Sequence, residues 1–306
     1  MAKQAASERS ADNLVNCEQS RGSGTLQQEE SCVWLRIIGT ETNLANDAGD
    51  PGYHQASVTY QIGGQKEFAP GWFVGASLGY ETSQLDGTGD GADVSGEGFL
   101  AGIMLKRQTG PWVLTGVLDG GYGWYDSVRQ IAVGSVTGQA TGSPDVDHVG
   151  VHFKAAYEIP LGAWYLKPNL TLSATYLGMS GYNEAGTTPF NLNVRSSSAV
   201  TGGVSPMVEL GRSGTASGFG VLRGFAGIGT AAYIDNDWKS QAGFALASAN
   251  AATFIATSKL PDAVAKLNAG FVLFSVLGIE GKLTYSAALA PGYSAQSFMG
   301  RLAYQF

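Results

Sequence analysis

The chain has 306 residues, of which 14% are charged and 44 are glycine, with a formal net charge of −7. Soluble domains usually contain about 25% charged residues and about 7% glycine, so this composition is not typical of them. A transmembrane helix is excluded because it needs about 20 consecutive apolar residues, and the acidic balance argues against nucleic-acid binding.

Residues 1–19 are rich in Ala, Lys, Gln, Glu and Arg, which all favour an α-helix. The few apolar residues, Leu14 and Val15, form no stripe that could dock on a hydrophobic core. A helix of this kind suits a hydrated pore, and a flexible linker is the alternative. The segment also lacks the apolar stretch of a signal peptide, so we expect the chain to be a fragment of an exported protein.

After this segment the hydrophobic period is two, as in β-strands. In residues 145–159, for example, Val149, Val151 and Phe153 share one face, and His152 lies on the other. Such runs reach the roughly 9–11 residues that a tilted strand needs to cross a bilayer. Aromatic residues gather near the ends of the runs, as interfacial girdles require: Trp72, Trp112, Trp124, Tyr125, Trp164, Tyr176, Tyr304 and Phe306.

The pattern predicts an all-β membrane protein, an antiparallel transmembrane β-barrel of about 12 strands with an N-terminal α-helix in the pore. Residues 1–31 form the plug helix and its linker, and residues 32–306 form the barrel. The predicted strands are 32–43, 53–63, 71–84, 94–108, 111–127, 145–159, 163–178, 197–211, 217–234, 262–276, 279–290 and 296–306.

A weak run at 241–256 would make an odd strand number, whereas single-chain bacterial barrels have even numbers. We therefore assign residues 235–261 to a long loop or an extended hairpin. The connections alternate between short ones, such as 64–70, and long ones, such as 128–144. Short periplasmic turns and long external loops are the expected asymmetry, so Phe306 lies on the periplasmic side.

Three patterns suggest chemistry but fit the barrel better as ordinary wall residues. Residues 75–79 match the G-x-S-x-G nucleophile motif, which needs a strand-to-helix turn and here lies within a strand. His148 and His152 share a face but are separated along the strand by about 13 Å, too far to bind one metal. Residues 86–97 approach a calcium-loop pattern that Thr88 interrupts, and a glycine-rich turn is the alternative. We expect no catalytic site, metal or cofactor.

Several stretches resemble the translocator domain of autotransporters, the type V secretion system. The resemblance rests on residues 166–168, Tyr176, 182–186 and 192–194, with the opening residues 33–36 and the closing residues 302–306. In the usual C-terminal assembly signal a glycine lies five residues before the final aromatic. Here that position is Arg301, and Gly300 lies one residue further back.

The resemblance implies a helix inside the pore that joins the first strand at the periplasmic end. Cys17 and Cys32 would then lie near the periplasmic rim, where a disulfide across a loop of about 15 residues contributes roughly 3 kcal/mol; two free thiols are the alternative. Recognition by the barrel-assembly machinery would use the final strand, with an assembly signal at Phe298, Leu302, Tyr304 and Phe306.

Some members of the family cleave their passenger inside the pore with an asparagine and acidic wall residues. Candidate asparagines here are Asn13 and Asn16, although the paired asparagines of the self-cleaving subgroup are absent. The candidate inward acids are Glu81, Glu97 and Asp119.

The resemblance implies a monomeric anchor and translocator in the bacterial outer membrane, with outer-membrane lipids, lipopolysaccharide and its own passenger polypeptide as partners. The expected lumen-facing wall is polar, so an unfolded chain can slide along it: Arg36, Gln55, Thr59, Glu81, Asp119, Lys154 and Lys167. A porin-like channel for small solutes without a secretion role is the alternative.

Overall fold

The computed structural model describes residues 18–19, 28–46, 52–88, 92–186, 189–216, 220–246, 253–274 and 277–306. The regular elements in these ranges are β-strands. Within the same ranges, no helix is both long enough and apolar enough to cross a membrane.

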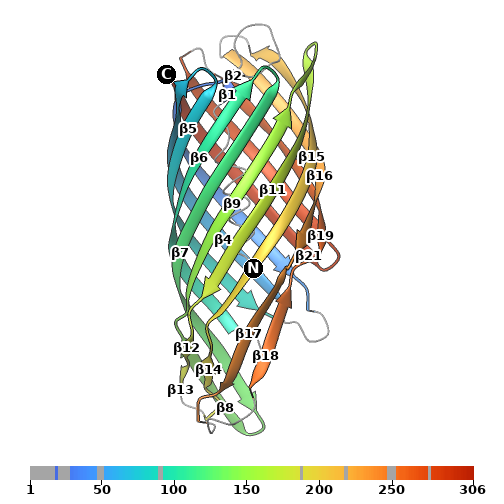
Figure 1. Ribbon diagram of the computed structural model, residues 1–306. Helices are drawn as coiled ribbons and strands as arrows, with labels where there is room; N and C mark the ends of the chain where they lie inside the picture. Colours follow the sequence, from blue (N-terminus) through green and yellow to red (C-terminus); the bar gives the residue numbers. More distant parts are fainter. Residues whose placement is uncertain are drawn as a thin grey trace.

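Twelve antiparallel strands close into a barrel (Figure 1), as the sequence predicts. They are β3 (Cys32–Leu44), β4 (Tyr53–Ala69), β5 (Trp72–Gly87), β6 (Ala92–Thr109), β7 (Trp112–Val133), β9 (Asp145–Tyr157), β11 (Trp164–Met179), β15 (Ser197–Ala216), β16 (Gly220–Ile234), β19 (Ala263–Phe274), β20 (Ile279–Ala290) and β21 (Tyr293–Gln305). The ring closes where β21 pairs with β3, from Tyr293 opposite Leu44 to Gln305 opposite Cys32.

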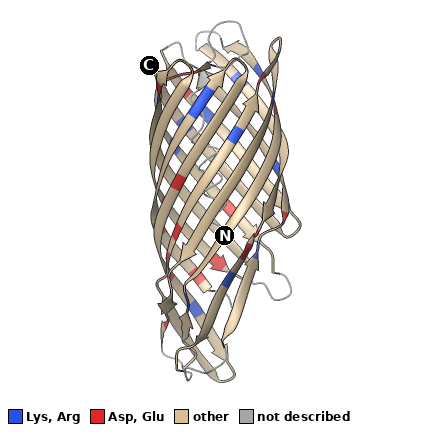
Figure 2. Ribbon diagram, in the orientation of Figure 1, with Lys and Arg blue, Asp and Glu red and all other residues tan. Residues whose placement is uncertain are grey.

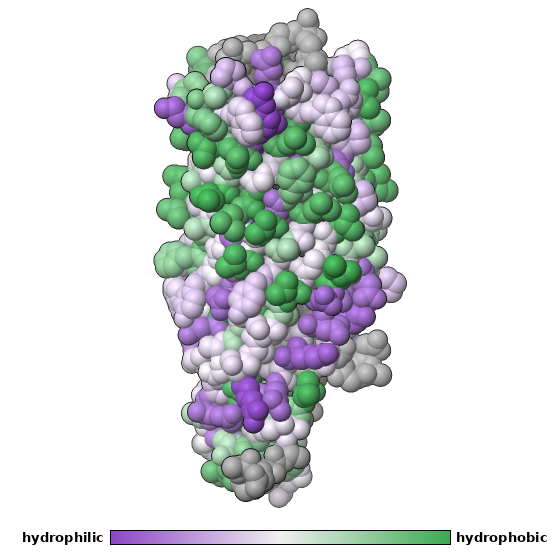
Figure 3. Space-filling model, in the orientation of Figure 1, coloured by the Kyte–Doolittle hydropathy of each residue, from purple (hydrophilic) through white to green (hydrophobic). Residues whose placement is uncertain are grey.

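Burial alternates along the barrel strands because successive side chains of a strand point to opposite faces. In β3, Trp34 and Arg36 are buried inside the barrel, whereas Val33, Leu35 and Ile37 are exposed on its outer surface. Figure 3 shows hydrophobic residues gathered over the barrel wall and hydrophilic residues nearer the end with the long loops. The outer surface therefore matches a hydrocarbon layer.

The short turns lie at the end of the barrel that carries the C-terminus (Figure 1). The predicted turn at 64–70 is wrong, because β4 continues to Ala69 through a bulge and the chain reverses at residues 70 and 71. Gly71 has a φ of +70°, a conformation that side chains with a Cβ disfavour, and so makes this tight turn possible. Short β10 (Ile159–Leu161) extends the sheet beside β11.

At the opposite end the chain builds an extension beyond the barrel (Figure 1). The predicted loop 128–144 contains the end of β7 and β8 (Val136–Gly142), and β13 (Ala185–Gly186) pairs with β8. A separate four-stranded sheet contains β12 (Tyr182–Asn183), β14 (Leu192–Val194), β17 (Asp237–Phe244) and β18 (Phe254–Lys259). The run at 241–256 therefore belongs to an external hairpin, which confirms that it is no thirteenth barrel strand.

The predicted N-terminal helix over 1–19 lies mostly outside the described residues. Its last two residues form β1 (Glu18–Gln19), which pairs with β2 (Gln28–Glu29), so the predicted helix end is wrong. Pairing with a neighbouring segment outweighs the helix propensity of these residues. The β1–β2 hairpin lies at the end of the barrel that also carries the C-terminus (Figure 1).

Candidate functional site

The inside of the barrel is lined with polar side chains. Among the residues expected there, four are buried inside the barrel: Arg36, Thr59, Glu81 and Asp119. Gln55 is partly buried on the same face of β4 as Thr59, and both Lys154 and Lys167 line internal cavities. Figure 2 shows that charged positions are sparse along the barrel strands.

An internal cavity of about 170 Å³ lies against the C-terminal half of the barrel. Its basic lining residues are Lys154, Lys266, Lys282 and Arg301, and Glu209 is the acid among the described residues that line it. This side of the lumen therefore presents more positive than negative charge to a chain in the pore.

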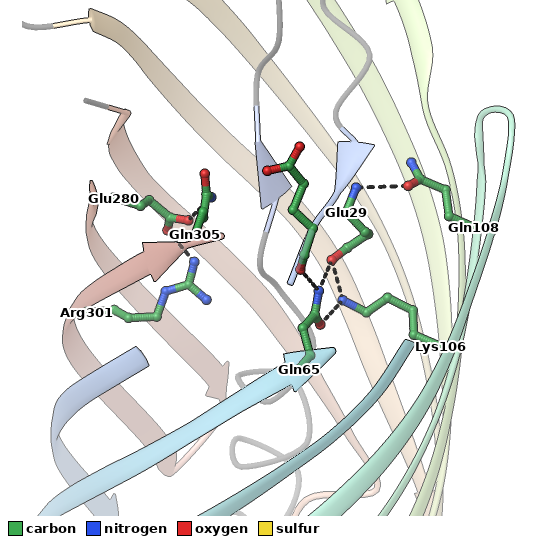
Figure 4. A network of polar contacts seen from close by, with 8 residues as sticks. Glu29, Gln65, Lys106, Gln108, Glu280, Arg301 and Gln305 are labelled. Carbon is green, nitrogen blue, oxygen red and sulfur yellow. Dashed lines mark hydrogen bonds and ion pairs between the residues drawn. The ribbon is translucent and has the colours of Figure 1, made fainter. Parts of the chain in front are cut away.

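A buried polar network joins the N-terminal segment to the barrel wall at the periplasmic mouth (Figure 4). Lys106 Nζ of β6 lies 2.6 Å from Glu29 Oε2 of β2, and the two side chains are 0% and 2% exposed. Gln65 of β4 bonds to both, donating to Glu29 Oε2 at 2.9 Å and accepting from Lys106 at 3.0 Å. The backbone N–H of Glu29 donates to Gln108 Oε1 at 2.9 Å.

This network fixes the place of β2, because removing either charge would leave the other buried and unpaired. Glu29, Gln65 and Lys106 were not among the functional residues predicted from the sequence. One signal was present, since Lys106 is a charged residue on the inward face of a spanning strand. Its partner could not be inferred, because Glu29 lies 77 residues earlier in the chain.

A second network supports the seam where the barrel closes (Figure 4). Arg301 of β21 forms a buried ion pair with Glu280 of β20. Gln305 donates to the other carboxylate oxygen of Glu280 at 3.4 Å. Arg301 lies opposite Arg36 in the β21–β3 register, and Arg36 Nε donates to Gln61 Oε1 at 2.7 Å. Glu280 thus gives Arg301 a buried partner beside the seam.

His148 and His152 both contact Asp119, an arrangement that the sequence did not predict. All three side chains are buried inside the barrel. His148 Nε2 lies 3.4 Å from Asp119 Oδ2, and His152 Nε2 lies 2.8 Å from Asp119 Oδ1. The reason is the register, because Asp119 of β7 pairs with Gly150, midway between the histidines of β9. No set of histidine, cysteine and acidic residues in the described ranges has the geometry of a metal site.

Glu97 is not an inward acid, which corrects one of the candidates for passenger cleavage. Its carboxylate accepts from Trp124 Nε1 at 3.0 Å and from the Tyr80 hydroxyl. Phe99, two residues along the same face of β6, is exposed on the outer surface of the barrel. Glu97 therefore belongs to the outer aromatic girdle, whereas Glu81 and Asp119 are buried inside. The candidate asparagines, at positions 13 and 16, lie outside the described residues.

The described residues of the calcium-loop and nucleophile patterns are also part of the barrel wall. Glu97, the last residue of the calcium pattern, bonds to the girdle, and positions 90 and 91 lie outside the described residues. Ser77, the serine of the nucleophile motif, lies within β5 and is buried. Its hydroxyl forms no hydrogen bond with the described residues.

The four residues expected in the assembly signal are exposed on the outer surface of the final strand and chain end: Phe298, Leu302, Tyr304 and Phe306. The rings of Tyr304 and Phe306 stack with centroids 6.5 Å apart. Cys32 is buried and disulfide-bonded. Cys17 lies outside the described residues, so its pairing with Cys32 stays a prediction.

In the extracellular extension, Glu184 is the acid of the stretch that carries the family resemblance. Its carboxylate forms a two-pronged ion pair with Arg129 of β7, at 3.0 Å to Nε and 2.5 Å to Nη2. The same carboxylate accepts from the backbone N–H of Leu192 at 2.8 Å. Glu184 holds the pKa of Arg129 above its ordinary value, because its carboxylate accepts a hydrogen bond from the guanidinium.

The barrel is similar to several solved autotransporter domains. The translocator domain of NalP from Neisseria meningitidis gives a TM-score of 0.70 at 15% identity, covering 100% of this chain and 97% of that one. The β-domain of BrkA from Bordetella gives 0.63 at 19% identity, covering 91% and 100%. The transport unit of AIDA-I from Escherichia coli gives 0.54 at 10% identity, covering 98% of each chain. At sequence identities of 10–19%, these structural similarities show the fold alone.

The family is shown by the sequence itself. No curated protein sequence matches this chain. The profile of the autotransporter β-domain matches residues 33–274, which is most of the barrel. The chain therefore belongs to the autotransporter β-domain family, and it serves as an anchor and translocator in the bacterial outer membrane.

Proposed function

We propose that the passenger polypeptide crosses the membrane through the lumen of this barrel and remains joined to it at the periplasmic mouth. The observation that carries this proposal is the buried pairing of Glu29 with Lys106. It holds the segment that precedes β3 against the inside of the wall, at the same end as the C-terminus. A chain that extends from this point toward the cell surface must pass through the pore.

The inner wall suits an extended polypeptide. Its exposed groups are hydroxyls, amides and charges, which offer replaceable hydrogen bonds and little apolar surface to which a chain could adhere. We assign this sliding role to the predicted lumen residues: Arg36, Gln55, Thr59, Glu81, Asp119, Lys154 and Lys167. No covalent step is needed, and folding of the passenger outside the cell would supply direction.

The mouth would hold the N-terminal segment by two independent ties. One is the network around Lys106, and the other is a disulfide between Cys17 and Cys32, which the burial and bonding of Cys32 support. Residues 1–31 would then act as the plug and linker, and residues 32–306 as the barrel. In this division the β1–β2 hairpin is part of the closed periplasmic mouth.

The outward aromatic edge of β21 would be the surface that the barrel-assembly machinery recognises. Tyr304 and Phe306 support this role because they are exposed and stacked at the end of the final strand. Lipopolysaccharide would contact the extracellular half of the apolar wall.

Conductance in planar bilayers distinguishes this proposal from a small-solute channel. We expect the full chain to conduct weakly and a chain lacking residues 1–30 to conduct several times more, because the deletion removes both ties at the mouth. An external variant, Lys239→Met, should conduct like the full chain. High and equal conductance of all three proteins would contradict the plugged translocator and favour the porin-like reading.

A further inference from the structure

Three cross-strand pairs follow one another around the periplasmic rim, two of a tryptophan with an arginine and one of two aromatic residues. Their strands are consecutive in the barrel, from β5 to β15. In the register each residue lies directly opposite its partner. The pairs, which we call the periplasmic belt, are Trp72 with Arg107, Trp112 with Tyr157, and Trp164 with Arg212.

The belt faces outward, toward the lipid. Trp72, Trp112 and Trp164 are 38%, 50% and 45% exposed. Arg107 and Arg212 share their strand faces with the exposed residues Leu105 and Leu210. Each tryptophan also begins a strand directly after a short turn, which places the belt at the level where the hydrocarbon ends.

The two arginines are held over tryptophan faces and have no acid as partner. The Arg107 Cζ lies 5.1 Å from the Trp72 ring centroid, and the Arg212 Cζ lies 5.4 Å from that of Trp164. Arg107 also donates to the Pro70 carbonyl. Among the described residues, neither guanidinium lies within ion-pair distance of a carboxylate.

The end of β4, just before the turn beside Arg107, contains an acid, Glu67, whose carboxylate has another partner. Its carboxylate accepts from the backbone N–H of Gly71 at 2.7 Å. The belt therefore keeps two oriented guanidinium groups, at a membrane interface, whose donors still need an acceptor. The oxygen pair of a phosphate matches the planar fork of a guanidinium, which can donate two hydrogen bonds to it.

The extracellular girdle has the opposite charge at the comparable place. There a carboxylate, Glu97, bonds to Tyr80 and Trp124 on the outer surface. Basic groups attract an anionic lipid surface by about 1 kcal/mol per residue, whereas a carboxylate repels it. The two arginines of the belt therefore favour an anionic lipid surface at the periplasmic end.

We propose that the periplasmic belt binds the phosphate of an anionic phospholipid headgroup in the inner leaflet of the outer membrane. Arg107 on β6 and Arg212 on β15 are separated by three intervening strands, so each binds the phosphate of a separate lipid. Trp72 and Trp164 fix the arginines and contact the glycerol region. The proposal rests on the location of the barrel in the membrane and is independent of passenger export, so either can fail without the other.

Native mass spectrometry of the folded full chain tests the site. The protein is released from nanodiscs of one part phosphatidylglycerol to three parts phosphatidylethanolamine, and the retained lipids are counted. We compare wild type with Arg107→Gln/Arg212→Gln and with Lys239→Gln/Lys259→Gln, which removes the same charge from the external hairpin. Heat-dependent gel mobility establishes that each variant has folded.

Wild type and the external control should retain phosphatidylglycerol in excess of its share. The belt variant should lose that preference by about five-fold per arginine removed, as expected from the interfacial attraction of one basic residue. Equal preference in all three proteins would overturn the proposal. Release of the lipid by millimolar inorganic phosphate would also overturn it, because it would mark a simple anion site with no lipid selectivity.

Discussion

The periplasmic mouth and the extracellular extension are both held by ion pairs between residues far apart in the sequence, but the pairs differ in depth. At the mouth, Lys106 and Glu29 are almost fully buried. In the extension, the Arg129 side chain remains 23% exposed while Glu184 is 3% exposed. The first pair joins the N-terminal segment to the barrel strand β6, whereas the second joins the extracellular end of β7 to a loop.

The difference in burial suits the two ion pairs to two different tasks. A deeply buried pair is costly to break because the remaining charge has no access to water, so it suits a permanent tie at the point where the pore segment meets the wall. A partly exposed pair can open with less penalty, so it suits loops that a moving chain displaces. We therefore expect damage at the mouth to affect the whole barrel and damage in the extension to stay local.

The largest effect is expected for Lys106→Met. This change leaves the Glu29 carboxylate buried without its cation, which should lower the free energy of unfolding by about 3–5 kcal/mol. Guanidinium denaturation of the folded barrel measures the loss. The double variant with Glu29→Met should recover most of it, and Lys239→Met on the external hairpin should have no measurable effect. A Lys106→Met variant as stable as wild type would contradict the stabilising role of the buried pair.

Replacing Cys32 by serine should be the next largest change. If Cys32 pairs with Cys17, the bridge closes a loop of about 15 residues and its loss should lower stability by about 3 kcal/mol. The oxidised protein and the variant should then differ in denaturation midpoint, and reduction of wild type should reproduce the variant. Peptide mass spectrometry without reduction identifies the partner, and alkylated free thiols at both positions would end the idea.

Arg129→Ala should act locally. The variant loses two hydrogen bonds to a charged partner, worth about 1.5–3 kcal/mol to the segment that they hold. Amide hydrogen exchange should accelerate in β13 and β14, while the denaturation midpoint of the barrel stays unchanged. Arg195→Ala, at an exposed position 3.3 Å from Gln241, is the matched control and should change neither. A lower denaturation midpoint of the barrel would show that the extension contributes to the stability of the barrel.

Gly71→Ala should give the smallest of these effects on the whole barrel. Gly71 has a φ of +70°, which costs a residue with a Cβ about 1–2 kcal/mol. Gly116→Ala is the control, since a Cβ there meets nothing within 4 Å. Denaturation midpoints of the two variants provide the comparison, and equal midpoints would show that the turn does not need glycine.

The barrel could be predicted from the sequence because its signal is local. Alternating residues in β3 and β9 mark the two faces, and an even strand number assigns the run at 241–256 to a hairpin. The turn after β4 was misplaced because residues 63–66 are Gly, Gly, Gln and Lys, which resemble a loop by composition. The strand continues instead and carries Gln65 to the mouth.

The site was harder to predict because its contacts join distant segments. No local pattern links Glu29 to Lys106, and the convergence of His148 and His152 depends on a neighbouring strand. Glu97 was assigned to the wrong face because glycines 96 and 98 flank it and give no apolar mark. The contact of Glu29 with Lys106, the convergence of the two histidines and the face of Glu97 all depend on burial and strand register, which follow from closure of the barrel.

Surface display of the N-terminus directly tests export of the passenger through this barrel. A folded reporter fused ahead of residue 1 is expressed in the full chain with a signal peptide, and intact cells are treated with protease. We predict that the reporter is cleaved from intact cells with wild type, while the barrel itself stays protected. A reporter that becomes cleavable only after the outer membrane is permeabilised would contradict export through this pore.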